Sequence, residues 1–489
     1  MTTLELTLTI LFSILGFALL TIILVVLIRT VRFKPIENEF KEDEKVEIDK
    51  EKAVTSLQTL VKCKTVSNVN RTLEDNNEFT KLIDSLKDLY PTVFENTTFT
   101  KLSDRALLFY LKGTIKEKHD PVVLMAHFDV VPANESNWEY PPFSGTRVDG
   151  KLIGRGTIDT KCTLNGVLRG AEELLLRGKR PNRDFYFAFA GDEETFGGSA
   201  SLAVEFFKKN NITPYFVLDE GGAVINGVFP GVNKYSAMIG IAEKGQSIVE
   251  FHLKSGGGHA SHPKPHTNVG MLAKLAVEIE KMHRKAVILT PIKEMFNCLG
   301  RHSTFVYRMI FANLWLFTPI LKIITRKSGG QLNAIMRTTT ALTQMQGSPA
   351  NNVIPSEAMI GLNLRTLPTE KASDNIEELK KIAEKYGATL KLGASWDPSK
   401  VSKMDSDGYY ILGNTIKNTW GKETIISPYV MTACADAHLY DELSDKVYRF
   451  SPMKICSEQM NMIHGDNEYL TDNQIAEVVE FYYRLMKNL

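Results

Sequence analysis

Residues 121–131, PVVLMAHFDVV, form an apolar run that is interrupted only by a histidine and an aspartate. Two more apolar runs, at 184–191 and 215–222, alternate with segments at 163–178 and 201–210 whose apolar residues have helical spacing. Continuous apolar strands are typical of a sheet that is covered on both faces, and their alternation with helices is typical of parallel sheets. The pattern predicts an α/β fold with a mostly parallel sheet.

The stretch FAGDEETFGG, at 189–198, places Asp192, Glu193 and Glu194 side by side directly after the second apolar run. Neighbouring carboxylates raise one another's pKa, and burying them without a cation carries a desolvation cost of several kcal/mol. A solvated turn would avoid that cost, and a bound metal ion would remove it.

Further metal-ligating residue types follow the other apolar segments. They are His127, Asp129, Asp159 and Asp219. A single histidine or aspartate at a strand end is more often structural, but with the carboxylates at 192–194 these residues lie on four successive segments, whose ends meet at the edge where open α/β sheets build their sites. Together with the adjacent carboxylates, they predict a metal centre at the carboxyl ends of the strands.

The composition excludes several other classes of function. The chain has 489 residues, of which 43% are hydrophobic and 24% charged, so it can bury a large core and divide into domains. A net charge of +1 gives no reason to expect a nucleic-acid partner. The five cysteines, Cys63, Cys162, Cys298, Cys434 and Cys456, form no CxxC pair, which argues against a thiolate zinc site.

The N-terminus differs from the rest of the chain. Residues 6–28, LTLTILFSILGFALLTIILVVLI, carry no charge and are long enough for a transmembrane helix. A signal peptide would have a shorter apolar region, a basic start and a small-residue cleavage site, so we predict a single-pass membrane anchor. Arg29, Arg32 and Lys34 follow the span and favour a cytoplasmic location for the remaining chain, whereas several Asn-x-Ser/Thr sequons would suit the opposite side.

Five motifs, taken in order, resemble one known family. HFDVVP, GRGTIDTK, AGDEETFGG, LDEGG and IHGDNEYL are similar to the motifs of the co-catalytic di-zinc exopeptidases, which include carboxypeptidase S, aminoacylase and glutamate carboxypeptidases. The resemblance runs from about residue 50 to the end. NLWLFTPIL, LNAIMRTTTALT and NNVIPSEA are most similar to the branch of carboxypeptidase S and the N-fatty-acyl-amino-acid hydrolases.

The resemblance implies a ligand set for two Zn²⁺ ions. Asp159 would bridge the two ions, His127 and Asp219 would hold one, and Glu194 and His464 would hold the other. Imidazole and carboxylate groups suit zinc, although they also accept Co²⁺ or Mn²⁺.

The resemblance also implies catalytic roles. Asp129 would orient His127 by accepting its second N–H, and Glu193 would be the general base that takes a proton from the attacking water. Asp192 has no such role in the family and is expected to cap or orient the loop.

Between 243 and 396 the sequence patterns follow the order strand, helix, two strands, helix, strand, which predicts an inserted α+β lid, and the resemblance implies that this domain also mediates dimerisation. We predict a transmembrane helix at 6–28, a charged linker at 29–45, a catalytic domain at 46–242 and 397–489, and the lid at 243–396. Within the lid, the longest uncharged run of the insertion at about 290–327, Met309 to Leu321, is too short to span a bilayer. Core packing is the favoured interpretation, ahead of an acyl-chain lining or a membrane contact.

Four lid and loop residues would meet the substrate. The resemblance implies that His259 stabilises the oxyanion, often from the partner subunit, and that Asn352 and Arg365 bind the substrate's backbone and free carboxylate. In MTACADAHLY (431–440), His438 stands where the branch has an arginine, which puts carboxylate recognition in doubt.

The sequence therefore predicts a membrane-anchored zinc hydrolase that cleaves an amide bond next to a free carboxylate. Short peptides and N-acyl amino acids both remain as substrates. The alternatives are an aminoacylase, a reversible N-acyl amino acid synthase, and a membrane-bound protein that binds metal without catalysis.

Overall fold

The main domain is built on one mixed sheet of eight strands. The computed structural model describes residues 2–36, 40–115, 120–227 and 229–489. In spatial order the strands are β1 (Thr98–Lys101), β2 (Ala106–Leu111), β6 (Phe185–Ala190), β3 (Val122–His127), β7 (Phe216–Ile225), β16 (Val447–Lys454), β8 (Ser236–Glu243) and β15 (Ile425–Met431). The centre of the sheet is parallel, from β6 through β3 and β7 to β16, whereas β1, β2 and β6 pair antiparallel. The α/β prediction is confirmed, with antiparallel pairs at the β1 edge and where β8 meets β16 and β7.

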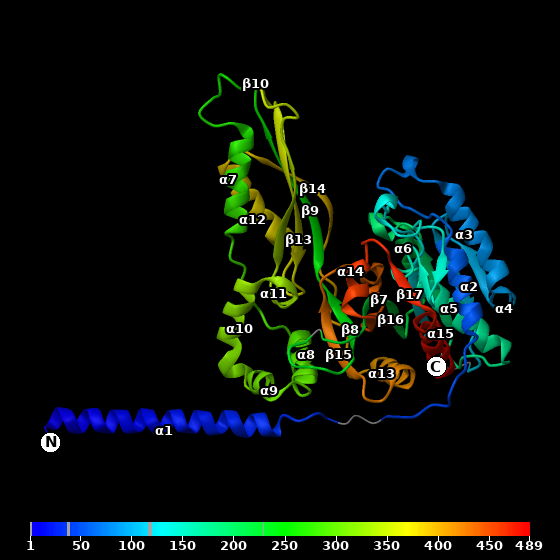
Figure 1. Ribbon diagram of the computed structural model, residues 1–489, viewed down its shortest axis with the longest axis horizontal. Coiled ribbons are helices and arrows are strands. Elements are labelled where there is room, and N and C mark those ends of the chain that lie inside the picture. Colours follow the sequence, from blue (N-terminus) through cyan, green and yellow to red (C-terminus); the bar gives the residue numbers. More distant parts are fainter. Residues whose placement is uncertain (1, 37–39, 116–119, 228) are drawn as a thin grey trace.

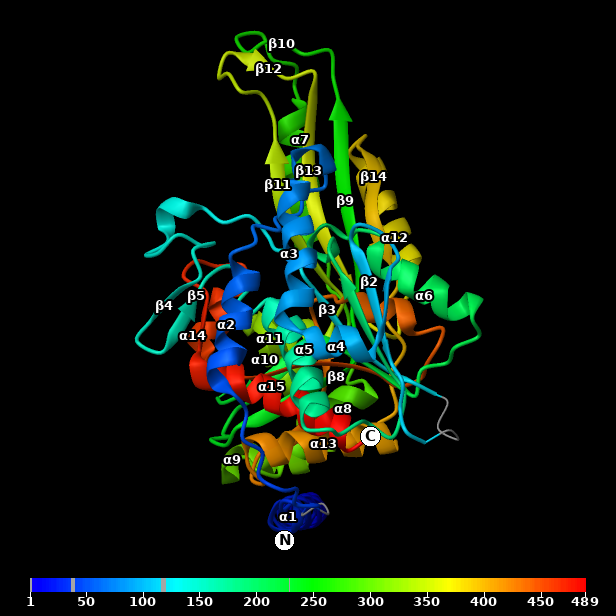
Figure 2. The same cartoon turned by 90° about the vertical axis from the view of Figure 1, so that its right-hand side faces the viewer.

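Helices cover both faces of this sheet (Figures 1 and 2). One face packs against α2 (Lys50–Val61), α3 (Asn76–Leu89), α4 (Pro91–Asn96), α5 (Lys161–Leu176) and α15 (Asp472–Lys487). The other face packs against α6 (Ser199–Lys209) and the 3₁₀ turn at Asp436–Tyr440. Leu107 and Leu108 are both buried, on opposite faces of β2, which explains why these strands have continuous apolar sequences.

Smaller elements complete the main domain. They are β4 (Thr146–Val148), β5 (Lys151–Ile153) and β17 (Tyr469–Thr471), which form a small sheet, with α13 (Asp407–Trp420) and α14 (Ser457–Met462).

The second domain, for which we keep the name lid, has its own sheet and core. Its antiparallel strands are β11 (Thr339–Gln346), β13 (Glu357–Thr366), β9 (Gly245–Lys254) and β14 (Thr389–Trp396), and its helices are α7 (Asn268–Glu280) and α12 (Ala372–Lys385). Leu275, Leu364 and Leu379 belong to a buried cluster that is separate from the core of the main domain. The short pair β10 (Gly258–His259) and β12 (Val353–Ile354) forms the far tip of the lid (Figures 1 and 2).

Four further helices lie between α7 and β11. They are α8 (Thr290–Gly300), α9 (Phe305–Ala312), α10 (Leu314–Ser328) and α11 (Gly330–Met336). Phe296 of α8 and Phe311 of α9 are buried in the core of the main domain, with ring centroids 5.1 Å apart. The prediction of core packing therefore holds for α8 and the end of α9, but it is wrong for the outward sides of α9 and α10. There Phe305 and Trp315 are exposed.

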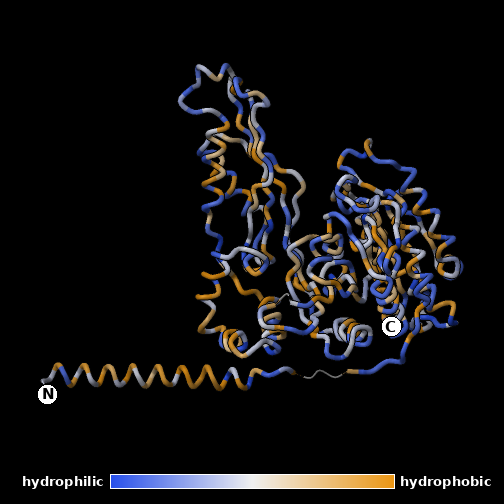
Figure 3. Tube along the Cα trace, viewed as in Figure 1, coloured by the Kyte–Doolittle hydropathy of each residue, from blue (hydrophilic) through white to orange (hydrophobic). Residues whose placement is uncertain are grey.

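The N-terminal helix α1 (Thr3–Arg32) begins before the predicted span and ends after it. Thr2 caps its first turn, with Glu5 completing a reciprocal capping box. Figure 3 shows it as an almost continuous hydrophobic segment, and only Val26 and Thr30 along it are buried. Among the described residues, this is the one unbroken helix that is long and apolar enough to cross a membrane.

Candidate metal centre

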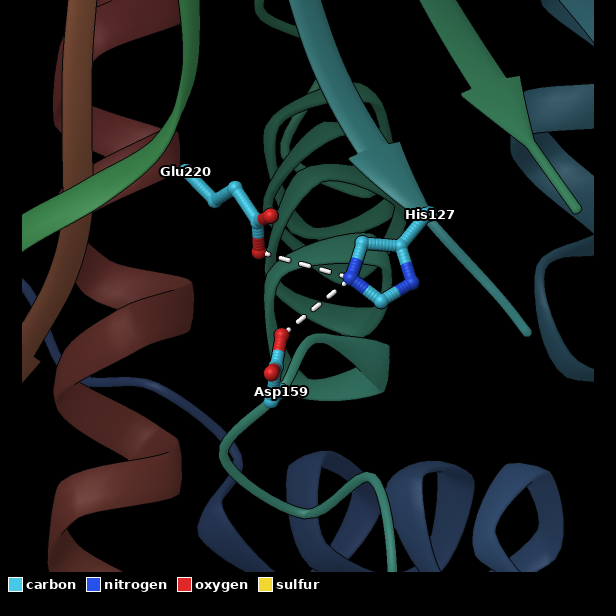
Figure 4. Close-up of side chains that lie close together, drawn as sticks. All are labelled: His127, Asp159 and Glu220. Carbon is cyan, nitrogen blue, oxygen red and sulfur yellow. Dashed lines mark hydrogen bonds and ion pairs between the residues drawn. The ribbon is translucent and has the colours of Figure 1, made fainter. Parts of the chain in front are cut away.

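Strand β3 ends in His127, whose imidazole meets two carboxylates. Its Nε2 atom lies 3.1 Å from Oδ1 of Asp159 and 3.5 Å from Oε2 of Glu220 (Figure 4). Asp159 precedes α5, and Glu220 belongs to β7. The ligand atoms of these three side chains lie within 4.8 Å of one another, close enough to share one metal ion.

Asp159 also belongs to a second triad of ligand atoms. Its other oxygen, Oδ2, lies 3.0 Å from Nε2 of His464, and that nitrogen lies 3.2 Å from Oε2 of Glu194. The two oxygens of one carboxylate thus face two different histidines. This is the arrangement that a carboxylate bridging two metal ions needs.

The structure places Glu220, rather than the predicted ligand Asp219, beside His127. The two carboxylate oxygens of Asp219 instead accept the N–H groups of Glu220 and Ala437, each at 2.9 Å. Because β7 continues through both residues, successive side chains point to opposite faces, and only one of them can reach His127. Both residues stand in LDEGG, and the assignment of Asp219 as a ligand stays a prediction.

Asp129 holds the two halves of the centre together. Its Oδ1 and Oδ2 atoms accept the main-chain N–H groups of Glu193 and Glu194, both at 3.1 Å, and Oδ2 also accepts the Ser67 hydroxyl at 2.7 Å. Nδ1 of His127 lies nearer to the Asp129 carbonyl oxygen, at 3.0 Å, than to its carboxylate, at 3.4 Å. Asp129 therefore fixes the orientation of His127 and the position of the glutamate turn.

The three adjacent carboxylates at 192–194 point to different partners. Asp192 accepts hydrogen bonds from the main-chain N–H and the hydroxyl of Ser199 at the start of α6. Glu194 belongs to the second triad, and Oε2 of Glu193 lies 4.0 Å from Nε2 of His127. Gly197 permits this tight turn, because a Cβ atom there would lie 2.0 Å from Cγ of Asp192.

Glu468 supports the loop of Asp159 and was missed by the sequence analysis. It is fully buried, and its carboxylate accepts the N–H groups of Gly156, Ile158 and Asp159. Its Oε2 atom also lies 2.9 Å from Nη1 of Arg155. It lies in IHGDNEYL, four residues after His464, so one motif supplies a ligand and the support for another.

The electrostatics of the centre favour bound cations. Burial raises the pKa of Glu220 to about 8 and that of Glu193 well above its ordinary value, while hydrogen bonds to Asp159 and Glu194 raise the pKa of His464 to about 10. Oε1 of Glu194 is buried and has no hydrogen-bond partner. A buried carboxylate oxygen normally has a partner, and a metal ion would supply one here. The nitrogen and oxygen donors of the two triads fit a pair of divalent metal ions.

Arg365 lies where the base of the lid meets the main domain. Its Nη1 donates to Sγ of Cys434 at 2.7 Å, and its Nε donates to Oδ1 of Asn363 at 2.9 Å. Arg365 and Trp396 both pair in register with Gln246 of β9, from the two neighbouring strands. Residues directly opposite in a sheet share a face, so the guanidinium and the indole lie on the same side of the lid.

His438 continues this surface from the main domain. Its ring stacks on Trp396, with centroids 5.4 Å apart and 7° between the planes, and Trp396 also packs against Phe196 at 5.2 Å. Nδ1 of His438 lies 2.8 Å from the Ala435 carbonyl oxygen and 3.4 Å from Oε1 of the buried Glu243. Phe196 follows the glutamate turn directly, so these three rings extend from the metal centre toward the lid.

The structure does not bring His259 and Asn352 to the metal ligands of the same chain. Both lie at the exposed tip of the lid, where the Ala260 N–H donates to the Asn352 carbonyl oxygen at 3.0 Å. Nδ1 of His259 contacts Oγ of Ser261 at 2.7 Å. Figures 1 and 2 show β10 at the end of the lid that is farthest from the main sheet.

Known proteins resemble this chain in sequence and in fold. The model of peptidase family M20/M25/M40 matches residues 123–488. A probable carboxypeptidase S-like 2 of Dictyostelium discoideum is 34% identical over 84% of this chain and 79% of its own length. The N-fatty-acyl-amino acid synthase/hydrolase PM20D1 of Xenopus tropicalis is 33% identical over 96% of this chain and 93% of its own length.

Two solved structures share the fold at low sequence identity. The M20 family metallo-carboxypeptidase Sso-CP2 from Sulfolobus solfataricus is 17% identical with a TM-score of 0.66, and covers 89% of this chain and 98% of its own. The YXEP protein of Bacillus subtilis, described as a dinuclear metal binding peptidase, is 13% identical with a TM-score of 0.51, and covers 90% and 98%.

Proposed function

This chain belongs to peptidase family M20/M25/M40, and from that premise we propose that it hydrolyses an amide bond next to a free carboxylate, using two bound zinc ions. The chain is a metallohydrolase by its family. The metal, the ligand set, the substrate and the residue roles are our proposal.

The proposed ligands are the two triads that share Asp159. His127 and Glu220 would hold one ion, and Glu194 and His464 the other. The observation that carries the proposal is the placement of the Asp159 oxygens, 3.1 Å from His127 and 3.0 Å from His464. Zn²⁺ fits this set of imidazoles and carboxylates, and Co²⁺ or Mn²⁺ would fit the same donors.

Glu193 is the proposed general base. When bound, the two ions polarise the substrate carbonyl and lower the pKa of the attacking water toward about 7. The Glu193 carboxylate accepts the proton of that water and donates it to the leaving nitrogen. Asp129 acts as a positioning residue, because its two oxygens hold the N–H groups at the start of the glutamate turn.

The substrate would carry a carboxylate and an apolar group. Arg365 can donate two parallel hydrogen bonds to a carboxylate, and the Cys434 thiol that it now contacts is a weak acceptor that a charged substrate would displace. The stacked rings of Trp396 and His438, beside Phe196, offer an apolar surface at the same end of the lid. This combination suits an N-acyl amino acid or a short hydrophobic peptide.

Two further features of the proposal concern assembly and location. Because His259 and Asn352 lie far from the metal ligands of their own chain, we propose that the lid pairs two copies and that His259 stabilises the oxyanion in the partner's centre. The helix α1 would remain as a single-pass anchor. Arg29, Arg32 and Lys34 at its end favour a cytoplasmic catalytic domain.

The test is hydrolysis by the zinc-loaded full chain of a panel of N-acyl amino acids and hydrophobic dipeptides, with Glu193→Gln as the matched variant. We expect the variant to retain two metal ions per chain and to lose about 10²–10⁴-fold in kcat, the range for general-base catalysis. The preferred substrate decides between acyl and peptide hydrolysis. Two bound ions without turnover of any substrate by the wild-type chain would instead favour a metal-dependent binding protein.

A further inference from the structure

The helices α9 and α10 expose an apolar surface to solvent. The two helices meet at a bend of 107°, so they do not form one straight membrane span. The exposed apolar residues of this surface, the α9–α10 face, are Phe305, Val306, Trp315, Ile320, Ile323 and Ile324. Ile320, Ile323 and Ile324 of α10 have the i, i+3, i+4 spacing of one side of a helix, and each of them, like Trp315, exposes more than half of its surface. Large exposed apolar patches mark interaction sites.

The α9–α10 face is attached directly to the end of α1. The side chain of Asn313, between α9 and α10, donates to the Val26 carbonyl oxygen at 3.2 Å and to the Thr30 hydroxyl at 3.3 Å. Nε of Arg29 donates to the Ala312 carbonyl oxygen at 3.1 Å. These hydrogen bonds join helices that are far apart in the sequence, and they fix where α1 leaves the body of the protein.

The length of α1 beyond this junction matches a bilayer. Residues 3–25 precede the first buried residue of the helix, and at about 1.5 Å per residue they extend about 34 Å. The hydrocarbon core of a bilayer is about 30 Å thick. In Figure 1, α1 runs past α9 and beyond the rest of the molecule, and α10 stands across its direction. Figure 2 shows the same helix almost end-on. A bilayer crossed by α1 would therefore meet α10 lying flat along its surface.

The charge pattern of α10 agrees with this placement. Arg326 and Lys327 are exposed in its last turn, next to the apolar residues, and Arg29 and Arg32 are exposed at the end of α1. Trp315 is the type of side chain that is enriched at membrane interfaces. Interfacial helices combine an apolar side with arginine and lysine, which attract anionic lipid headgroups.

We propose that the α9–α10 face docks on the surface of the bilayer that α1 crosses, with its apolar side chains in the headgroup region. The inference rests on α1 being retained as an anchor, but not on the proposed reaction. Phe311 of α9 is buried against Phe229 and Phe296 of the main domain, with centroids 4.7 and 5.1 Å away. Docking would therefore fix the orientation of the main domain relative to the membrane. Anchoring by α1 alone would not do so.

Tryptophan fluorescence of the full chain in lipid nanodiscs tests the proposal. The discs contain phosphatidylcholine and phosphatidylserine, with or without bromine on the acyl chains, and the contribution of Trp315 is the difference between the wild type and Trp315→Phe. We expect brominated lipid to quench Trp315 at least about twofold and the disc to shield it from iodide. Ile320→Glu with Ile323→Glu should reduce the quenching, whereas Val69→Glu, on an exposed loop of the main domain, should not.

Each other result counts against the proposal in a distinct way. If the chain enters the discs but Trp315 stays unquenched and accessible to iodide, the face does not dock. If Trp315 is shielded from both quenchers, a second copy of the chain covers the face instead. If the chain does not enter the discs, α1 is not an anchor, and the docking falls with it. Hydrolase activity is a separate readout, so none of these results bears on the reaction.

Discussion

Nη1 of Arg365, in the lid, donates a hydrogen bond to Sγ of Cys434, in the main domain, at 2.7 Å. The contact crosses the junction of the two domains beside the stacked rings of Trp396 and His438. At its Nη1 atom this half-buried guanidinium has only a thiol as acceptor, and sulfur is a poor hydrogen-bond acceptor. A substrate carboxylate is the better partner, which makes Arg365 the residue of the lid most suited to substrate binding.

Replacing Arg365 should weaken binding of the substrate carboxylate. We expect Arg365→Lys to raise KM about 10- to 100-fold, because a lysine cannot make two parallel hydrogen bonds to a carboxylate. The measurement is kcat/KM for an N-acyl amino acid and for its carboxamide, in wild type and variant. If the variant discriminates between the two substrates as well as the wild type does, Arg365 does not bind the carboxylate. Cys434→Ser is the control, since it keeps the arginine and changes only its present partner.

Glu220 and Asp219 should differ sharply in metal binding. Glu220→Gln removes a carboxylate 3.5 Å from His127, so we expect it to bind one metal ion fewer per chain. Asp219→Asn should retain both ions, because its oxygens accept main-chain N–H groups, and should instead lower the midpoint of thermal unfolding. Elemental analysis after dialysis, with circular dichroism to check folding, measures both effects. The opposite pattern of metal loss would restore Asp219 as the ligand.

Asp129 should affect metal affinity only by holding the glutamate turn in position. An asparagine at 129 keeps one oxygen but cannot accept the N–H groups of both Glu193 and Glu194, so the glutamate turn loses one of its supports. We expect Asp129→Asn to weaken metal binding about 10- to 100-fold, the usual cost of losing a residue that orients a ligand. Competition with a chelator gives the affinity. Ser67→Ala, which removes only the hydroxyl donor to Asp129, should have a smaller effect.

Removal of the metal should change how stability depends on pH. In the metal-free chain burial raises the pKa of Glu220 from 4.5 to about 8, so between these values the folded state binds more protons than the unfolded state. Stability should therefore fall as pH rises from about 5 to about 8 in EDTA. Zinc should reverse this trend, because protons compete with the ion for the ligands. Thermal unfolding at several pH values measures the stability with and without zinc. Parallel curves of stability against pH in the two conditions would contradict the expectation.

Much of the centre could be predicted because its ligands follow recognisable strands. The apolar runs before His127 and Glu194 indicated both the sheet and the edge where ligands meet. The choice between Asp219 and Glu220 depends on strand alternation, since β7 continues past the motif and a one-residue shift reverses the face. Glu468 was missed because it acts on main-chain N–H groups, which a sequence motif does not display.

The surfaces were harder to predict than the core. The segment around Trp315 has the composition of a buried helix, and only the packing of its neighbours shows which side stays exposed. Likewise, the distance of His259 from the metal ligands depends on the length of the lid strands and on no local motif.

The ring of His438 should determine how the enzyme responds to the length of the apolar group. Because His438 stacks on Trp396, the pair presents a flat surface, and such aromatic pairs contribute about 0.5–1.5 kcal/mol beyond burial. We expect Trp396→Ala to lower kcat/KM for a long-chain N-acyl amino acid about 10-fold or more and for an N-acetyl amino acid much less. His438→Ala should have a similar but smaller effect, and the double variant should lose less than the two effects combined, since each ring supports the other. Equal losses for long and short acyl groups in both alanine variants would show that the stacked rings only stabilise the fold.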